Sequence, residues 1–103
     1  MVLVVALGAS GLAACRTPRT VCEDYVTAIR RMFDRCAPGW TFDIRWTDGV
    51  VGCENVQSVS DPGIIYNQCI PWADQVSCAD INPTDPGSSL DPSCSAGVFR
   101  RTR

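Results

Sequence analysis

Residues 20–36 read TVCEDYVTAIRRMFDRC and carry the clearest structural pattern in the chain. Apolar side chains recur there every three or four residues, which is the spacing of one face of an α-helix. Thr20 and Glu23 have the spacing of a capping box, in which each side chain accepts a hydrogen bond from the other residue's backbone N–H. Pro38 and Gly39 then end the pattern. The sequence therefore predicts an amphipathic helix over 20–36 with its apolar face in the core.

Cysteines are the second strong pattern in the chain. Cys22 and Cys36 lie about four turns apart on the apolar face of this helix, so we expect a disulfide near each of its ends. The chain has seven cysteines in 103 residues. If Cys15 has another use, six remain for three disulfides, whose pairing the spacing leaves open: Cys22, Cys36, Cys53, Cys69, Cys78 and Cys94. Such a framework is typical of short domains exported from the cytoplasm.

The segment after the helix allows two interpretations. Residues 40–47 alternate strictly between apolar and polar side chains, which predicts a strand. Asp48-Gly49 could close a hairpin onto residues 50–56, giving an α+β fold. Alternatively, Asp48 caps a helix whose apolar face comprises Val50, Cys53, Val56 and Val59. We favour the helix, although Gly49 and Gly52 weaken it.

A further helix is expected to begin after residue 61. Asp61 is a suitable cap and Pro62 suits the first helical position, and an apolar face continues to residue 76. Pro71 should kink or break this helix, and Cys78 should lie near its end. Residues 82–92 are rich in Pro, Asp, Gly and Ser and predict a loop, which Cys94 ties back to the domain. We expect residues 96–103 to form a basic, flexible tail.

The N-terminus suggests export. Residues 1–14 carry no charge and are too few to span a membrane as a helix, which needs roughly 20 apolar residues. They match the apolar region of a signal peptide, although no basic residue precedes them. Leu12-Ala13-Ala14-Cys15 resembles the lipobox of bacterial lipoproteins. That resemblance implies removal of residues 1–14, a diacylglycerol thioether on Cys15, and a tether over 15–19. It also accounts for the odd cysteine.

Three short motifs resemble a known group of domains. The motifs are Cys36-Ala37-Pro38, residues 76–81 (VSCADI) and Asp91-Pro92-Ser93-Cys94. They are similar to motifs in small cysteine-rich lipoprotein domains of myxobacteria and other delta-proteobacteria. The resemblance covers roughly residues 20–95. It implies a mostly helical, disulfide-linked module outside the cytoplasm and carries no activity. The stretch from Trp40 to Trp46 is not part of that pattern.

Composition excludes several classes of function. The chain has no histidine, so a Ser/His/Asp or Cys/His catalytic set cannot form within it. No close cysteine pair suggests a zinc or thioredoxin-like site. All eleven acidic residues lie between Glu23 and Asp91, and this acidic body argues against nucleic acid as a partner. We expect no enzymatic activity, no metal, and no cofactor beyond the lipid on Cys15.

The sequence as a whole predicts a small, disulfide-rich, mainly α domain over 20–95, with about three short helices and three disulfides. The predicted function is that of a lipid-anchored lipoprotein of the cell envelope, acting as a structural or protein-interaction module. Arg16 follows the lipid cysteine where an inner-membrane retention signal would have Asp, which favours the outer membrane. The alternative is a module that binds a small ligand or glycan through Trp40, Trp46 and Trp72, because aromatic anchors dominate many interfaces.

Overall fold

Helix α2 (Pro18–Cys36) is the longest element of the computed structural model, which describes residues 16–95 and 99–101. It begins at Pro18 because Thr17 is the N-cap: the Thr17 hydroxyl accepts a hydrogen bond from the Thr20 amide at 3.1 Å. Proline suits the first helical position since no partner is needed there for an N–H. The predicted Thr20–Glu23 capping box is therefore wrong. Thr20 lies inside the first turn, and Glu23 pairs with Arg19.

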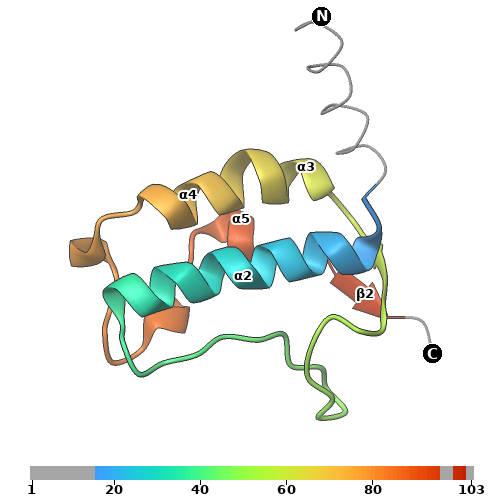
Figure 1. Cartoon of the computed structure of the whole chain (residues 1–103), viewed down its shortest axis with the longest axis horizontal. Helices are drawn as coiled ribbons and strands as arrows, with labels where there is room; N and C mark the ends of the chain where they lie inside the picture. The colour runs from blue at the N-terminus through green and yellow to red at the C-terminus, as the bar shows by residue number, and fades with distance from the viewer. Residues whose placement is uncertain (1–15, 96–98, 102–103) are drawn as a thin grey trace, which may run out of the picture.

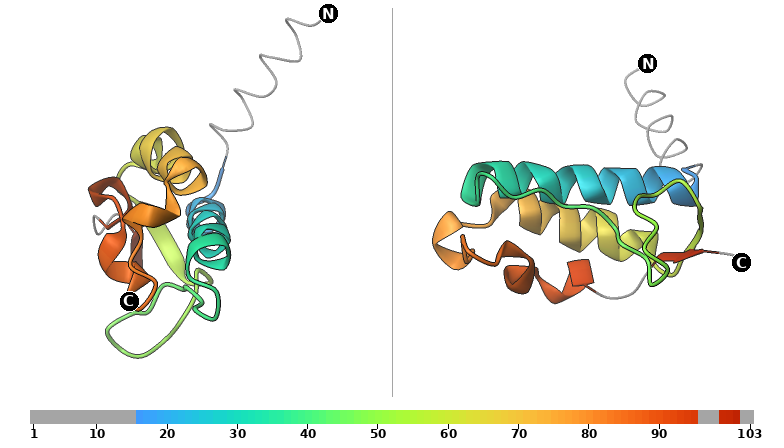
Figure 2. Two further views of the ribbon diagram at one scale, coloured as in Figure 1. Left: turned by 90° about the vertical axis from the view of Figure 1, so that its left-hand side faces the viewer. Right: turned by 90° about the horizontal axis from the view of Figure 1, so that it is seen from below.

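A second helical run packs along α2. It consists of α3 (Pro62–Ile64), the π-helix η1 (Ile65–Cys69) and α4 (Ile70–Gln75). Asp61 caps its start as predicted, with Oδ1 accepting a hydrogen bond from the Ile64 amide at 3.2 Å. Figures 1 and 2 show the two helical layers side by side and running in the same direction. Because α2 ends at one end of the domain and the second run starts at the other, residues 37–61 must return along the length of α2.

Pro71 changes the type of helix without breaking it. A proline ring crowds the carbonyl four residues earlier and removes one N–H donor. The backbone widens into the π-helix just before Pro71, where the Ile70 amide bonds to the Ile65 carbonyl. Such single π-turns relieve a conflict of this kind within an otherwise regular helix. The kink or break expected at Pro71 is thus replaced by the π-helical turn η1, and the helix continues through Pro71.

Residues 40–47 do not form the predicted strand. They are extended, but their only bridge joins Arg45 to Val51. The alternation instead reflects one buried face, because Phe42, Ile44 and Trp46 pack against the core. The segment covers α2 without a partner strand beside it.

The preferred helix after Asp48 is also wrong. Gly49 and Gly52 have φ angles of 88° and 106°, in the left-handed region that a right-handed helix does not use. A tight turn does form, with the Gly49 amide bonded to the Trp46 carbonyl at 2.9 Å. The hairpin alternative is likewise limited to this turn and its single bridge.

The two-stranded sheet joins distant parts of the chain. Strand β1 (Val56–Val59) pairs in antiparallel fashion with β2 (Phe99–Arg101), and Val59 lies opposite Phe99. The Phe99 ring also contacts Tyr25 of α2, with ring centres 5.3 Å apart. Residues 99–101 therefore correct the expectation of a flexible tail over 96–103.

Three disulfides hold these layers together, and the prediction of a small, mainly α, disulfide-rich fold is confirmed. Cys22–Cys53 and Cys36–Cys78 join the two ends of α2 to other segments, as predicted. Cys69–Cys94 joins η1 to the short helix α5 (Pro92–Ser95). Two 3-10 turns, η2 (Cys78–Asp80) and η3 (Pro86–Ser89), lie between α4 and α5. The fully buried side chains include Ile29, Met32, Ile65 and Pro86.

Candidate functional site

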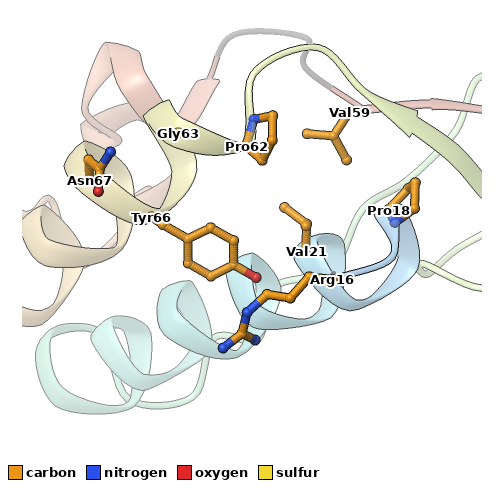
Figure 3. Close-up of a pocket in the computed structure, with 8 residues that line it drawn as sticks. All are labelled: Arg16, Pro18, Val21, Val59, Pro62, Gly63, Tyr66 and Asn67. Carbon is orange, nitrogen blue, oxygen red and sulfur yellow. The ribbon is translucent and has the colours of Figure 1, made fainter. Parts of the chain in front are cut away.

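A hollow of about 450 Å³ lies between the first turns of α2, strand β1 and the start of the second helical run. We call it the Tyr66 groove. Its lining residues are Arg16, Pro18, Val21, Val59, Pro62, Gly63, Tyr66 and Asn67. Figure 3 shows the side chains of Val21, Val59 and Tyr66 around one common space. The groove has the volume of a small-ligand site and a largely apolar wall, which is typical of such sites.

Arg16 forms one rim of the groove. It directly precedes the N-cap, where a side chain commonly packs against the fourth helical residue, here Val21. Arg16 and Val21 both line the groove. The Arg16 Nη1 donates to Asp24 Oδ2 at 2.6 Å. The guanidinium carbon lies 5.1 Å from the centre of the Tyr66 ring. Two contacts, one with Asp24 and one with Tyr66, therefore hold the point at which the chain enters the domain.

Tyr66 closes the other side of the groove. It lies in the π-helix, and its hydroxyl donates to Asp24 Oδ2 at 2.5 Å. Burial, followed by the nearby Asp24 carboxylate, raises the pKa of Tyr66 to about 12. The phenol is therefore neutral near neutral pH and acts as a hydrogen-bond donor. Arg16, Asp24 and Tyr66 form a paired set whose charges are already satisfied within the protein.

A second hollow of about 300 Å³ shares Arg16 and Tyr66 with the Tyr66 groove. Asp24, Thr27, Arg31 and Ile70 line it together with that pair, so its wall is more polar. Sequence reasoning missed Arg16, Asp24 and Tyr66 as a group. A local signal was present, since Thr17-Pro18 is itself a helix start, but the position of Tyr66 depends on the π-turn.

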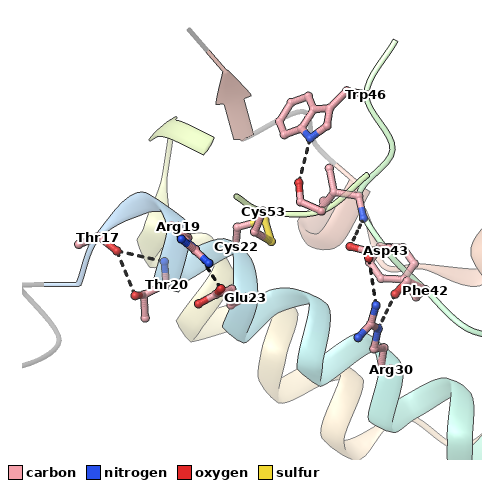
Figure 4. Close-up of a disulfide and its surroundings, with 12 residues drawn as sticks. Thr17, Arg19, Thr20, Cys22, Glu23, Arg30, Phe42, Asp43, Trp46 and Cys53 are labelled. Atoms are coloured by element: carbon pink, nitrogen blue, oxygen red, sulfur yellow. Dashed lines mark hydrogen bonds and ion pairs between the residues drawn. A yellow bond between two sulfur atoms is a disulfide. The ribbon is translucent and has the colours of Figure 1, made fainter. Parts of the chain in front are cut away.

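A third hollow of about 280 Å³ lies beside the Cys22–Cys53 disulfide. Arg30 spans it from α2, with Nε bonded to the Phe42 carbonyl at 2.6 Å and Nη2 paired with Asp43 at 3.0 Å (Figure 4). These contacts fix the returning segment on α2. Four of the charged side chains that line the hollow, Arg19, Glu23, Arg30 and Asp43, are paired with one another, so we interpret it as part of the scaffold.

The three tryptophans lie in different environments. Trp40 is 46% exposed. The indole N–H of Trp46 donates to the Gly52 carbonyl at 2.9 Å, and the Arg101 guanidinium carbon lies 4.9 Å from its ring centre. Trp72 lies on α4 and packs partly against the core. In the described part of the chain, no ring contact joins any two of the three.

Cys15, the predicted lipidation site, lies outside the described residues. The six cysteines predicted to form disulfides are all paired. Within residues 16–95 and 99–101, no group of three or more His, Cys, Asp or Glu side chains is arranged to hold a metal ion. No helix in the same ranges is long and apolar enough to cross a membrane.

Comparison with protein-family models, with curated proteins and with solved structures finds no match for this chain.

Proposed function

We propose that the chain is a lipoprotein of the cell envelope, anchored through a lipid on Cys15, that serves as a structural or protein-interaction module. The observation that carries the proposal is the pairing of the cysteines. Three disulfides use every cysteine after residue 15, and the one outside them ends the sequence Leu12-Ala13-Ala14-Cys15. The motif and the pairing are independent observations, and the pairing accounts for every cysteine other than the one in the motif.

The disulfides also support a site outside the cytoplasm. Disulfides form and persist in oxidising compartments and are rare where thiols are kept reduced. Each bridge of this kind stabilises a small domain by about 2–4 kcal/mol. Such a contribution is a large part of the net stability of a domain this short. Export from the cytoplasm would therefore be part of how the protein folds.

The position of helix α2 makes the proposed anchor short. Only Arg16 and Thr17 separate Cys15 from the first helical residue, Pro18. The contacts of Arg16 with Asp24 and Tyr66 leave little slack in this connection. A domain anchored in this way would lie close to the membrane surface, where it could contact neighbouring envelope proteins. Arg16 after the cysteine favours the outer membrane.

The test is the intact mass of the protein extracted without reduction from membranes of a bacterium expressing the full chain. The expected mass starts at Cys15, includes acyl groups and lacks six hydrogens for three disulfides. The Cys15→Ser variant is the matched control and should remain unacylated while retaining its disulfides. An unacylated wild-type chain that retains residues 1–14 would overturn the proposal.

A second candidate function is binding of a small ligand or glycan through the tryptophans. The observation that favours it is the exposure of Trp40, at 46%. Acrylamide quenching of the full chain, compared with its Trp40→Phe variant, would isolate the emission of this residue. Protection of that emission by an added soluble glycan would support ligand binding, and unchanged quenching across a panel of glycans would count against it.

A further inference from the structure

The described residues that form the walls of the Tyr66 groove are mainly apolar and carry no unpaired charge. Val21, Val59, Pro62 and the Tyr66 ring form its walls. Its one cation, Arg16, is already paired with Asp24 at 2.6 Å. An anionic ligand would have to compete with that carboxylate, whereas an apolar chain would only displace water from the walls. The chemistry of the groove therefore favours an aliphatic occupant.

The groove lies next to the proposed point of lipid attachment. Cys15 directly precedes Arg16 in the sequence. Arg16 is itself a lining residue of the groove and is held by Asp24 and Tyr66. A lipid bonded to Cys15 would therefore start at the rim. Because this lipid is tethered beside the groove, its effective concentration there would exceed that of any free lipid.

We propose that one acyl chain of the lipid on Cys15 lies in the Tyr66 groove, an inference that rests on the lipidation proposed above. The volume of about 450 Å³ suits a ligand of this size. A second protein would need a far larger contact, because stable interfaces bury roughly 800 Å² on each partner. Docking of one chain leaves the other acyl groups for the membrane, and stable anchoring needs at least two hydrophobic signals.

A photo-crosslinking experiment tests this placement in the full chain. Bacteria expressing the protein are fed palmitic acid that carries a mid-chain diazirine, their membranes are irradiated, and the purified protein is mapped by peptide mass spectrometry. The expected result is a cross-link from the Cys15 acyl chain to peptides that contain Val21 or residues 59–66. Intact mass of the same sample reports the acyl groups and the three disulfides.

Two substitutions provide matched controls. Val59→Asp places a carboxylate in the wall of the groove and should reduce the intrachain cross-link at least several-fold. Val51→Asp changes an exposed valine outside the groove and should leave the cross-link unchanged. The disulfide count in the intact mass verifies that both variants fold.

The outcomes separate the two proposals. A chain without acyl mass would overturn the lipoprotein assignment together with this inference. An acylated wild-type chain that cross-links only to membrane lipids would overturn the docking inference alone. An equal cross-link in the Val59→Asp and wild-type chains would also overturn it, because the acyl chain would then lie elsewhere on the domain.

Discussion

Arg16, just outside helix α2, contacts both α2 and the π-helix. It directly precedes the Thr17 cap, and its guanidinium makes both contacts. The exposed ion pair by itself contributes little. The cation–π contact with Tyr66 adds to it, because one conformation of the side chain serves both interactions. The entry point of the chain is therefore fixed by a residue that helix periodicity does not single out.

Replacing Arg16 with Ala should lower the free energy of unfolding by about 1 kcal/mol, since an exposed ion pair and an exposed cation–π contact are each worth somewhat less than that. Urea unfolding with the disulfides intact measures the effect. Arg100→Ala is the matched control, because Arg100 is exposed on β2, and it should change stability by less than about 0.5 kcal/mol. Equal effects of the two substitutions would show that the Arg16 contacts contribute nothing.

Both tyrosines should resist ionisation until the fold is lost. Burial raises the pKa of Tyr25 to about 12, and burial with the Asp24 contact does the same for Tyr66. A raised pKa in the folded state means that this stability is complete below pH 10.0, the ordinary tyrosine value, and is lost as pH rises towards 12. Phenolate absorbance and circular dichroism should therefore change together above pH 10. A phenol that titrates near pH 10.0 in the folded protein would contradict this assignment.

At the scale of elements, sequence periodicity and capping residues predicted the helices, whose formation depends mainly on local interactions. The apolar period of residues 20–36 and the Asp61-Pro62 start correspond to α2 and the second helical run. The alternation over residues 40–47 correctly marked a half-buried segment, but a strand also needs a partner, which only the tertiary structure supplies. The helix expected after Asp48 failed because two glycines turn the backbone into the left-handed region.

Gly52→Ala should therefore destabilise the protein by about 1 kcal/mol. Its φ angle is 106° and a Cβ there would meet nothing within 4 Å, so the cost is the backbone conformation alone. Gly87→Ala is the matched control, because its Cβ would also meet nothing within 4 Å and its φ is not positive. Thermal unfolding should show a lower midpoint for Gly52→Ala and an unchanged or slightly higher one for Gly87→Ala. The reverse order would refute the conformational explanation.

At the scale of the whole molecule, the contacts that sequence reasoning could not supply are long-range. The number of disulfides followed from composition, whereas their pairing depends on how α2, η1 and the returning segment meet. Strand β2 and the Tyr66 groove also depend on contacts between residues far apart in the sequence. For example, no periodicity or spacing in the sequence indicates that Val59 pairs with Phe99. Such contacts appear only once the two helical layers are in place.

The contribution of each disulfide to the free energy of unfolding should depend on its burial more than on the length of the loop that it closes. Cys36–Cys78 spans 42 residues and Cys69–Cys94 spans 25, which favours the first by only about 0.5 kcal/mol in chain entropy. Cys69 and Cys94 are 0% and 3% exposed, whereas Cys78 is exposed at the surface. Replacing the buried pair with alanines leaves a cavity that costs on the order of 1–2 kcal/mol more.

We therefore expect the Cys69→Ala/Cys94→Ala double variant to lose more stability than the Cys36→Ala/Cys78→Ala variant, measured by urea unfolding without reductant. Limited reduction of the wild-type chain should also open Cys36–Cys78 first, since thiol exchange requires access to a sulfur atom. Alkylation and peptide mapping identify the opened pair. A larger loss from the Cys36–Cys78 variant would show that constraint of the unfolded chain outweighs packing, and that the core tolerates the cavity around Cys69.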